Sequence, residues 1–138
     1  MILKMDVEGA EWGFFEQVSS EILSQFSQMT FEFHEILNHP NPELVLKVFR
    51  KINQTHQLIH MHGNNNGAYI SFGDKIFCDS PELSYVLRSK YSFSEEYDVN
   101  LPLSLDEANF PSLPEIEIGR WNEEAEIGER LTVHLKAF

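Results

Sequence analysis

The chain has 138 residues, and its 22 acidic against 10 basic side chains give a formal net charge of −12 with neutral histidines. With 42% hydrophobic and 12% aromatic residues, the composition excludes a disordered chain and allows one folded domain with a core. The excess of carboxylates argues against nucleic acid and anionic membrane surfaces as partners, because proteins bind both chiefly through Lys and Arg.

Cysteine content and hydropathy limit the cellular setting. Cys78 is the one cysteine, so no disulfide can form within the chain, and we expect the cytoplasm as its compartment. No run approaches the roughly 18 consecutive apolar residues of a membrane span. The first residues run into Asp6 and Glu8 rather than into the apolar core of a signal peptide, so we expect no membrane partner.

The chain begins with a strand, a helix and a second strand. Residues 2–7 form a short, mostly apolar run typical of a buried strand. A helix is predicted after residue 10, because apolar residues then recur every three or four positions. These are Trp12, Phe15, Val18, Ile22 and Phe26. Residues 29–35 alternate apolar and polar side chains, which predicts a second strand ending near His34.

A second helix and a third strand follow. Asn41 has the form of an N-cap, Pro42 suits the first helical position, and Glu43 is an acidic residue in the first turn. Residues 57–62 predict a third strand, which the turn-forming residues 63–67 close. This βαβαβ order predicts an α/β fold whose three strands are parallel neighbours in one sheet.

The pattern changes after residue 67. Residues 69–72 and 75–77 flank Gly73-Asp74, which predicts a hairpin, and residues 83–90 predict a strand antiparallel to the sheet. Residues 97–119 carry three prolines and receive no regular element. Residues 120–138 suggest a helix followed by a strand. We therefore divide the chain into an α/β domain (1–97) and an extended region with a C-terminal segment (98–138).

Polar side chains follow each of the three predicted parallel strands. In an open α/β sheet, ligands bind beyond the carboxyl ends of the strands, which meet at one edge. The candidate residues at these ends are Asp6, Glu8, His34, Glu35, His62, Asn64 and Asn65.

Four segments of the chain resemble one enzyme family. Residues 3–12, LKMDVEGAEW, resemble the L-K-x-D-x-E-G-x-E-W signature of FkbM-like S-adenosylmethionine-dependent methyltransferases. Residues 31–34, FEFH, resemble the E-x-H strand ending of that family, and residues 60–65, HMHGNN, its H-x-H-x-N-N motif. Residues 81–86, PELSYV, are similar to the P-x-x-L-E-L-T-Y-V run that follows. The resemblance covers residues 2–90.

The resemblance implies a partial class I methyltransferase (Rossmann-like) sheet: βαβαβ, then a hairpin and an antiparallel strand. Its first motif corresponds to the fourth strand of the family's sheet, so residues 1–97 correspond to the C-terminal half. A doubly wound nucleotide-binding half carries a glycine-rich turn after its first strand, and none precedes residue 2. We therefore expect an acceptor-side fragment without the cofactor half, and no methyl transfer by this chain alone.

The implied cofactor is S-adenosylmethionine, and the implied acceptor is a glycan or a small hydroxylated molecule. We assign no residue to cofactor binding. In the implied strand order the fourth strand is central, so a missing N-terminal half or a second copy of the chain should cover the exposed sheet edge. The alternative is a non-catalytic α/β remnant that binds a partner or self-associates.

Methyl transfer to a hydroxyl requires removal of the hydroxyl proton, and a histidine held by a carboxylate suits that task. We assign His34 as the base, with Glu8 or Asp6 to orient it or to hold hydroxyls. We assign substrate binding to Glu35, His62, Asn64 and Asn65, since amides, carboxylates and imidazoles bind hydroxyls.

Structural roles compete with these functional assignments. Asp6 and Glu8 could only stabilise the helix that follows, and His34 could be a hydrogen-bonded histidine at a strand end. Asn64 and Asn65 could only form the turn. We interpret Glu11 as a solvated or capping residue of the first helical turn, outside the catalytic set. A composite of Asp6, Glu8, His34 and His62 offers ligands for Mn, Fe or Zn, but we assign no metal.

Overall fold

The computed structural model describes residues 1–72, 75–93, 99–121 and 131–134. The main sheet consists of β1 (Ile2–Met5), β2 (Gln28–Glu32), β6 (Pro81–Leu87) and β3 (His56–Gly63), in the spatial order β1-β2-β6-β3. β1 and β2 pair in parallel, whereas β6 is antiparallel to both β2 and β3. The predicted α/β class is therefore correct at the level of a mixed sheet with helices.

The predicted order of strands is wrong at one position. We expected residues 57–62 to lie beside residues 29–34, but β6 lies between β2 and β3. The side chains of β6 explain this central position. Leu83 and Tyr85 are each only 3% exposed, and an apolar strand of this kind gains more burial between two strands than at an edge.

The first predicted helix is two helices. α1 (Glu11–Gln17) ends at Val18, whose backbone is extended, and α2 (Ser20–Leu23) starts one residue later. The Ser19 hydroxyl accepts a hydrogen bond from the Ile22 N–H at 3.3 Å and so caps α2. A serine that bonds the backbone in this way favours a new helix start over continuation of the old helix.

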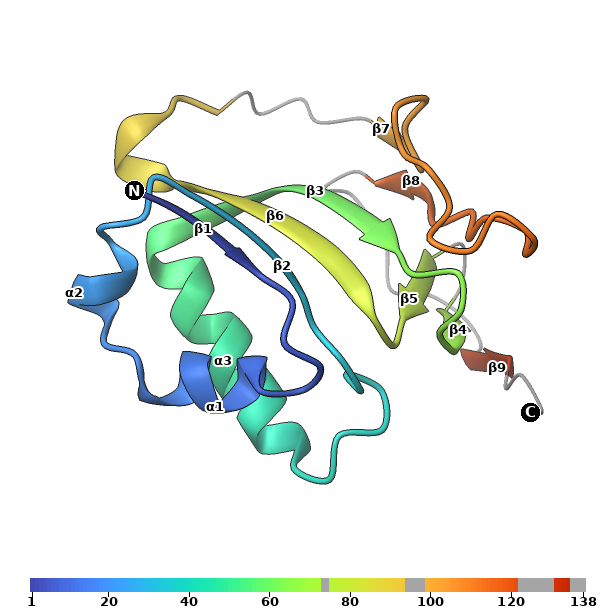
Figure 1. Cartoon of the computed structure of the whole chain (residues 1–138), viewed down its shortest axis with the longest axis horizontal. Helices are drawn as coiled ribbons and strands as arrows, with labels where there is room; N and C mark the ends of the chain where they lie inside the picture. Colours follow the sequence, from blue (N-terminus) through green and yellow to red (C-terminus); the bar gives the residue numbers. More distant parts are fainter. Residues whose placement is uncertain (73–74, 94–98, 122–130, 135–138) are drawn as a thin grey trace.

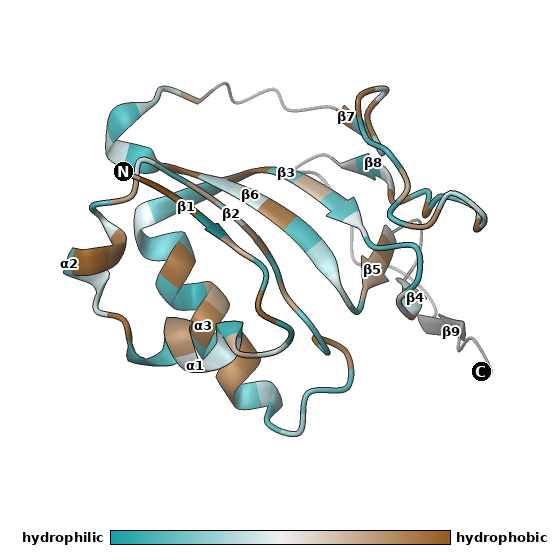
Figure 2. Cartoon of the chain, in the orientation of Figure 1, coloured by the Kyte–Doolittle hydropathy of each residue, from teal (hydrophilic) through white to brown (hydrophobic). Residues whose placement is uncertain are grey.

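The second predicted helix is confirmed as α3 (Pro42–Thr55). Asn41 caps it, because its side-chain oxygen accepts from the Leu44 N–H at 3.2 Å. Hydrophobic bands recur along α3 in Figure 2, and its buried residues are Val45, Val48 and Ile52. The helices lie together on one side of the main sheet in Figure 1. None of the described helices has the length and apolar character needed to cross a bilayer.

Aromatic rings join α1 to the strand beneath it. The Trp12 ring stacks on Phe33 with centroids 4.3 Å apart, and Phe15 lies 4.8 Å from Phe31. All four side chains are at most 5% exposed. The core therefore fixes α1 against the end of β2.

The predicted hairpin is confirmed as β4 (Tyr69–Phe72) paired antiparallel with β5 (Lys75–Cys78), while its turn, residues 73–74, lies outside the described residues. β9 (Leu131–His134) pairs with β4 and confirms a strand in the tail. The helix expected before it falls largely on residues 122–130, also outside the described part. β6 ends at Leu87 rather than at residue 90, and a 3₁₀ turn, η1 (Arg88–Lys90), follows it.

The region expected to be irregular contains two short strands. β7 (Val99–Leu101) and β8 (Gly119–Trp121) pair antiparallel and bring together the ends of the segment 99–121, which we call the arm. The expectation of no regular element therefore fails at the ends of the arm. Between the two strands, the described residues 102–118 form neither helix nor strand, as their three prolines favour.

The ammonium group of Lys51 on α3 should stabilise the end of α1. It donates hydrogen bonds to the carbonyls of Phe15, Glu16 and Val18 at 3.0, 2.8 and 2.7 Å. We expect Lys51→Met to lower the free energy of unfolding by about 2 kcal/mol, because helix-terminal carbonyls then lose a charged donor. Denaturant unfolding measures this change.

Lys47 on the same helix provides the matched control. Its contact with Glu16 joins two side chains that are 60% and 44% exposed, and exposed pairs contribute little. Lys47→Met should therefore lower the free energy of unfolding by less than about 0.5 kcal/mol. Equal costs for the two variants would contradict the capping role of Lys51.

Candidate functional site

The turn between β1 and α1 has an unusual backbone. Glu8 and the following Gly9 both adopt left-handed conformations, with φ of 52° and 99°. This conformation suits glycine but is uncommon for a residue with a side chain. The turn places the side chains of Asp6 and Glu8 beyond the end of β1, where both residues are exposed.

Glu11 holds this turn from inside the protein. Its carboxylate accepts hydrogen bonds from the backbone N–H of Val7 at 3.0 Å and of Gly9 at 2.8 Å. Glu11 is 0% exposed, and a buried carboxylate requires such partners because losing water is costly. Of the two roles that we considered for Glu11, the solvated one is therefore wrong, and its carboxylate bonds backbone N–H groups just before the helix.

His34 is fixed by two neighbouring residues of α1. Its Nδ1 lies 3.2 Å from Oε1 of Glu11, and its backbone carbonyl accepts from the indole N–H of Trp12 at 2.8 Å. The His34 side chain is 18% exposed. The helix thus determines both the position of the strand end and the orientation of the imidazole.

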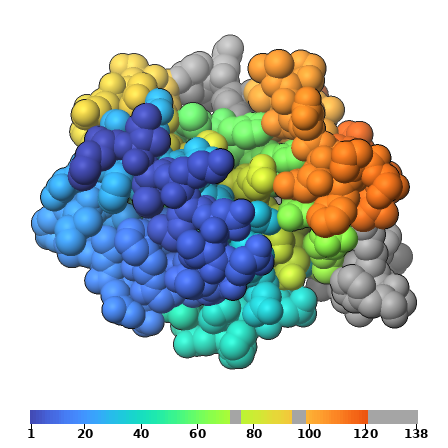
Figure 3. Space-filling view, viewed as in Figure 1, coloured from blue at the N-terminus to red at the C-terminus, as the bar shows by residue number. Residues whose placement is uncertain are grey.

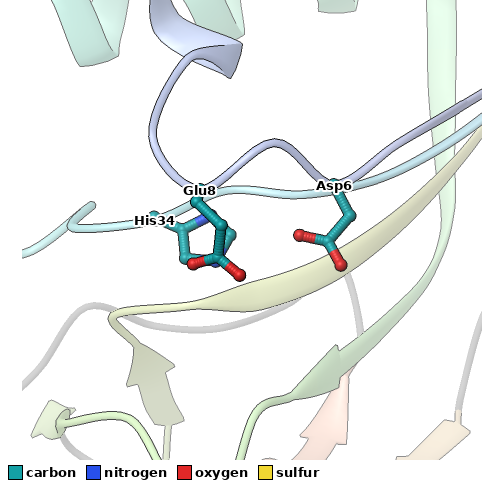
Figure 4. Close-up of side chains that lie close together, drawn as sticks. All are labelled: Asp6, Glu8 and His34. Carbon is teal, nitrogen blue, oxygen red and sulfur yellow. The ribbon is translucent and has the colours of Figure 1, made fainter.

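The other imidazole nitrogen of His34 faces carboxylates. Nε2 lies 3.4 Å from Oε2 of Glu8 and 3.8 Å from Oε1 of Glu32. Figure 4 shows Asp6, Glu8 and His34 side by side, and one potential ligand atom from each lies within 4.8 Å of the others. We call Asp6, Glu8, Glu32 and His34 the His34 cluster. The structure brings together all three residues that we assigned to catalysis.

Glu32 also belongs to the cluster, although its place in the sequence predicts no functional role for it. Its side chain is 10% exposed, and Oε1 accepts from the amide of Asn64 at 2.8 Å. Burial raises the pKa of Glu32, and the nearby carboxylates of Asp6 and Glu82 add to this, while Asn64 and His34 act in the opposite direction. Asn64 therefore reaches the cluster through Glu32.

His62 lies where the sheet meets the arm. Its Nδ1 is 3.4 Å from Glu82 on β6, and its Nε2 is 3.3 Å from Glu115 of the arm. Asn109 of the arm donates to the other oxygen of Glu82 at 2.9 Å. His62 is only 4% exposed, so a substrate has little access to it. Its contacts with Glu82 and Glu115 instead link the arm to the sheet.

Two of the predicted substrate-binding residues lie apart from these contacts. Asn65 is 0% exposed, and its side chain bonds the backbone of Phe110, Leu113 and Pro114. We therefore assign it to anchoring the arm. Glu35 is exposed with φ of 60°, and among the described residues no hydrogen bond or ion pair joins it to the His34 cluster.

Carboxylates dominate the side of the sheet at which β1 and β2 end. Five of them contact or surround the imidazoles of His34 and His62: Asp6, Glu8, Glu32, Glu82 and Glu115. In Figure 3 the N-terminal segment in dark blue and the arm in orange flank atoms from the middle of the chain. Such an edge offers acceptors for hydroxyl groups and favours cations over anions.

Comparison of the chain with protein-family models, with curated proteins and with solved structures finds no match.

The raised pKa of Glu32 predicts a pH-dependent stability. The ionised carboxylate is less favourable in the folded than in the unfolded chain, so stability falls as pH rises from the unfolded value through the raised folded value. Glu32→Gln mimics the protonated form and can still accept from Asn64. It should therefore raise the melting temperature at pH 7 and leave it unchanged near pH 4.

Thermal unfolding at both pH values measures this difference, and Glu107→Gln on the exposed surface of the arm is the control. A Glu32→Gln protein that is less stable than the natural chain at pH 7 would show that ionised Glu32 stabilises the fold.

Proposed function

We propose that the chain supplies the acceptor side of an S-adenosylmethionine-dependent O-methyltransferase that resembles the FkbM family and acts on a glycan or a small hydroxylated molecule. The observation that carries this proposal is the environment of His34: Nδ1 contacts the buried carboxylate of Glu11, and Nε2 faces the edge of the sheet. The mixed sheet with its antiparallel β6 agrees with the architecture that the resemblance implies.

The His34 cluster has the groups needed to accept a proton from a hydroxyl. Because Glu11 occupies Nδ1, the lone pair of Nε2 is the one available to an acceptor molecule. Proton removal by a positioned base contributes about 10²–10⁴-fold to rate. The carboxylates of Glu8 and Glu32 lie beside Nε2 and would stabilise the imidazolium that forms.

The cluster also fits part of the implied cofactor. S-adenosylmethionine supplies an electrophilic methyl group on a positively charged sulfur. The carboxylates of Asp6 and Glu8 suit that positive charge and the hydroxyls of a ribose. Among the described residues, we assign none to the adenine ring.

Calorimetric titration with S-adenosylmethionine tests the proposal. We expect weak but saturable binding by the natural chain, because only the part of the cofactor that faces Asp6 and Glu8 finds partners. Binding by Asp6→Asn should be weaker still, because the variant loses one of these two carboxylates. Glu43→Gln, an exposed change in the first turn of α3, should leave the affinity unchanged. His34→Ala should also retain binding, since His34 serves the hydroxylated acceptor.

The result that overturns the proposal is the absence of saturable heat at millimolar S-adenosylmethionine. That outcome supports the alternative, a non-catalytic binding or self-association module. If the chain is such a module, its partner or second copy is expected first at β1, the outer strand of the main sheet, where Ile2 is 70% exposed.

The same cluster supports a second candidate function, the binding of a divalent metal ion. The observation that favours it is the distance of 4.8 Å or less between one ligand atom each of Asp6, Glu8 and His34. Two carboxylates and an imidazole suit Mn, Fe or Zn. The two functions compete, because a metal would occupy the Nε2 lone pair that a base requires.

Titration with MnCl₂ separates these two functions. Metal binding is supported if Mn²⁺ broadens the NMR signals of residues 5–9 and 32–35 alone and if Glu8→Gln abolishes this paramagnetic broadening. Lys47→Met on α3 lies outside the cluster and should not change the result. Absence of broadening at millimolar Mn²⁺ removes the metal candidate and leaves His34 free to act as a base.

A further inference from the structure

Glu11 is the buried ionisable residue whose role the proposed proton transfer leaves open. Its two oxygens contact three nitrogens: Oε1 lies 3.0 Å from the Val7 N–H and 3.2 Å from His34 Nδ1, and Oε2 lies 2.8 Å from the Gly9 N–H. Both oxygens accept backbone N–H groups, and an ionised carboxylate has no proton to donate. In the contact between ionised Glu11 and His34, the hydrogen therefore comes from the imidazole.

This hydrogen bond selects one of the two neutral forms of the imidazole. With the proton on Nδ1, the lone pair lies on Nε2, which faces Glu8 and Glu32. In the other form, the lone pair of Nδ1 would face the Glu11 carboxylate at 3.2 Å, and two acceptors would meet in a site with little water. The Nε2 lone pair of the first form meets acceptors at a lower cost, because the Glu8 side chain is 85% exposed to water and Glu32 is 3.8 Å away. The geometry thus favours the form with the proton on Nδ1.

The backbone of His34 is held from the same helix. The indole N–H of Trp12 donates to the His34 carbonyl at 2.8 Å, and the Trp12 ring stacks on Phe33. Rotation of the imidazole about its bond to the backbone would break the contact with Glu11. Consecutive residues of α1 therefore hold the strand end and the ring in one arrangement.

We propose that Glu11 is a positioning residue that keeps the proton of neutral His34 on Nδ1 and presents Nε2 to the molecule bound at the sheet edge. The inference deepens the proposed function, since it names the nitrogen that receives the acceptor's proton. The protonation pattern itself is a property of this chain and can be measured without any substrate.

Long-range ¹H–¹⁵N NMR spectra of the imidazoles at pH 8 test the proposal. These spectra distinguish the two neutral forms of each histidine, and the spectrum of His34→Asn identifies the signals of His34 among the six histidines. We expect the natural chain to carry the proton of His34 predominantly on Nδ1. A proton predominantly on Nε2 would overturn the proposal.

Two variants separate positioning from a purely structural role. Glu11→Gln leaves one acceptor oxygen for three N–H groups, so we expect His34 to become a mixture of both forms while the far-ultraviolet circular dichroism stays native. Glu8→Gln changes the carboxylate on the opposite nitrogen and should keep the proton on Nδ1. A Glu11→Gln spectrum identical to that of the natural chain would contradict the role of Glu11.

The outcome is independent of the proposed methyl transfer. A proton on Nδ1 in a chain that does not bind S-adenosylmethionine supports positioning by Glu11 and rejects the methyltransferase. A proton on Nε2 in a chain that does bind S-adenosylmethionine rejects positioning and leaves the methyltransferase in place.

Discussion

The arrangement of the candidate site depends on one buried carboxylate. Glu11 is removed from water, so both of its oxygens must find hydrogen-bond donors within the protein. It takes them from the turn after β1 and from the histidine after β2. The left-handed conformations of Glu8 and Gly9 are tolerated because they direct N–H groups of this turn toward the buried carboxylate.

The sheet makes this connection possible. β1 and β2 are parallel neighbours, so their carboxyl ends lie at the same edge and a residue at the start of α1 reaches both. The antiparallel β6 starts at that edge and contributes Glu82 beside His62. The arm then closes over this part of the edge through Glu115 and Asn109. The result is a carboxylate-rich edge with two histidines held in fixed surroundings.

Local signals were sufficient for part of this structure. Asn41 and Pro42 predicted the start of α3. The position of His34 at the end of a predicted strand placed it near Asp6 and Glu8, as the structure has it. Long-range effects were not accessible in the same way. The position of β6 depends on burial in the whole sheet, and the pairing of β7 with β8 joins residues about twenty positions apart. Glu11 was expected in solvent because an acidic residue in a first helical turn is usually solvated. Its position two residues after Gly9 was a signal in the other direction, because the N–H groups of a turn at that glycine need an acceptor.

Hydrogen exchange at the turn after β1 tests most directly whether Glu11 organises the site. Val7 and Gly9 are exposed residues, but their N–H groups bond to the buried carboxylate, whereas the described part of the chain supplies no acceptor for the N–H of Glu8 between them. If Glu11 holds the turn, the Val7 and Gly9 amides exchange slowly and the Glu8 amide exchanges fast. Equally fast exchange of all three amides would show that Glu11 does not hold the turn.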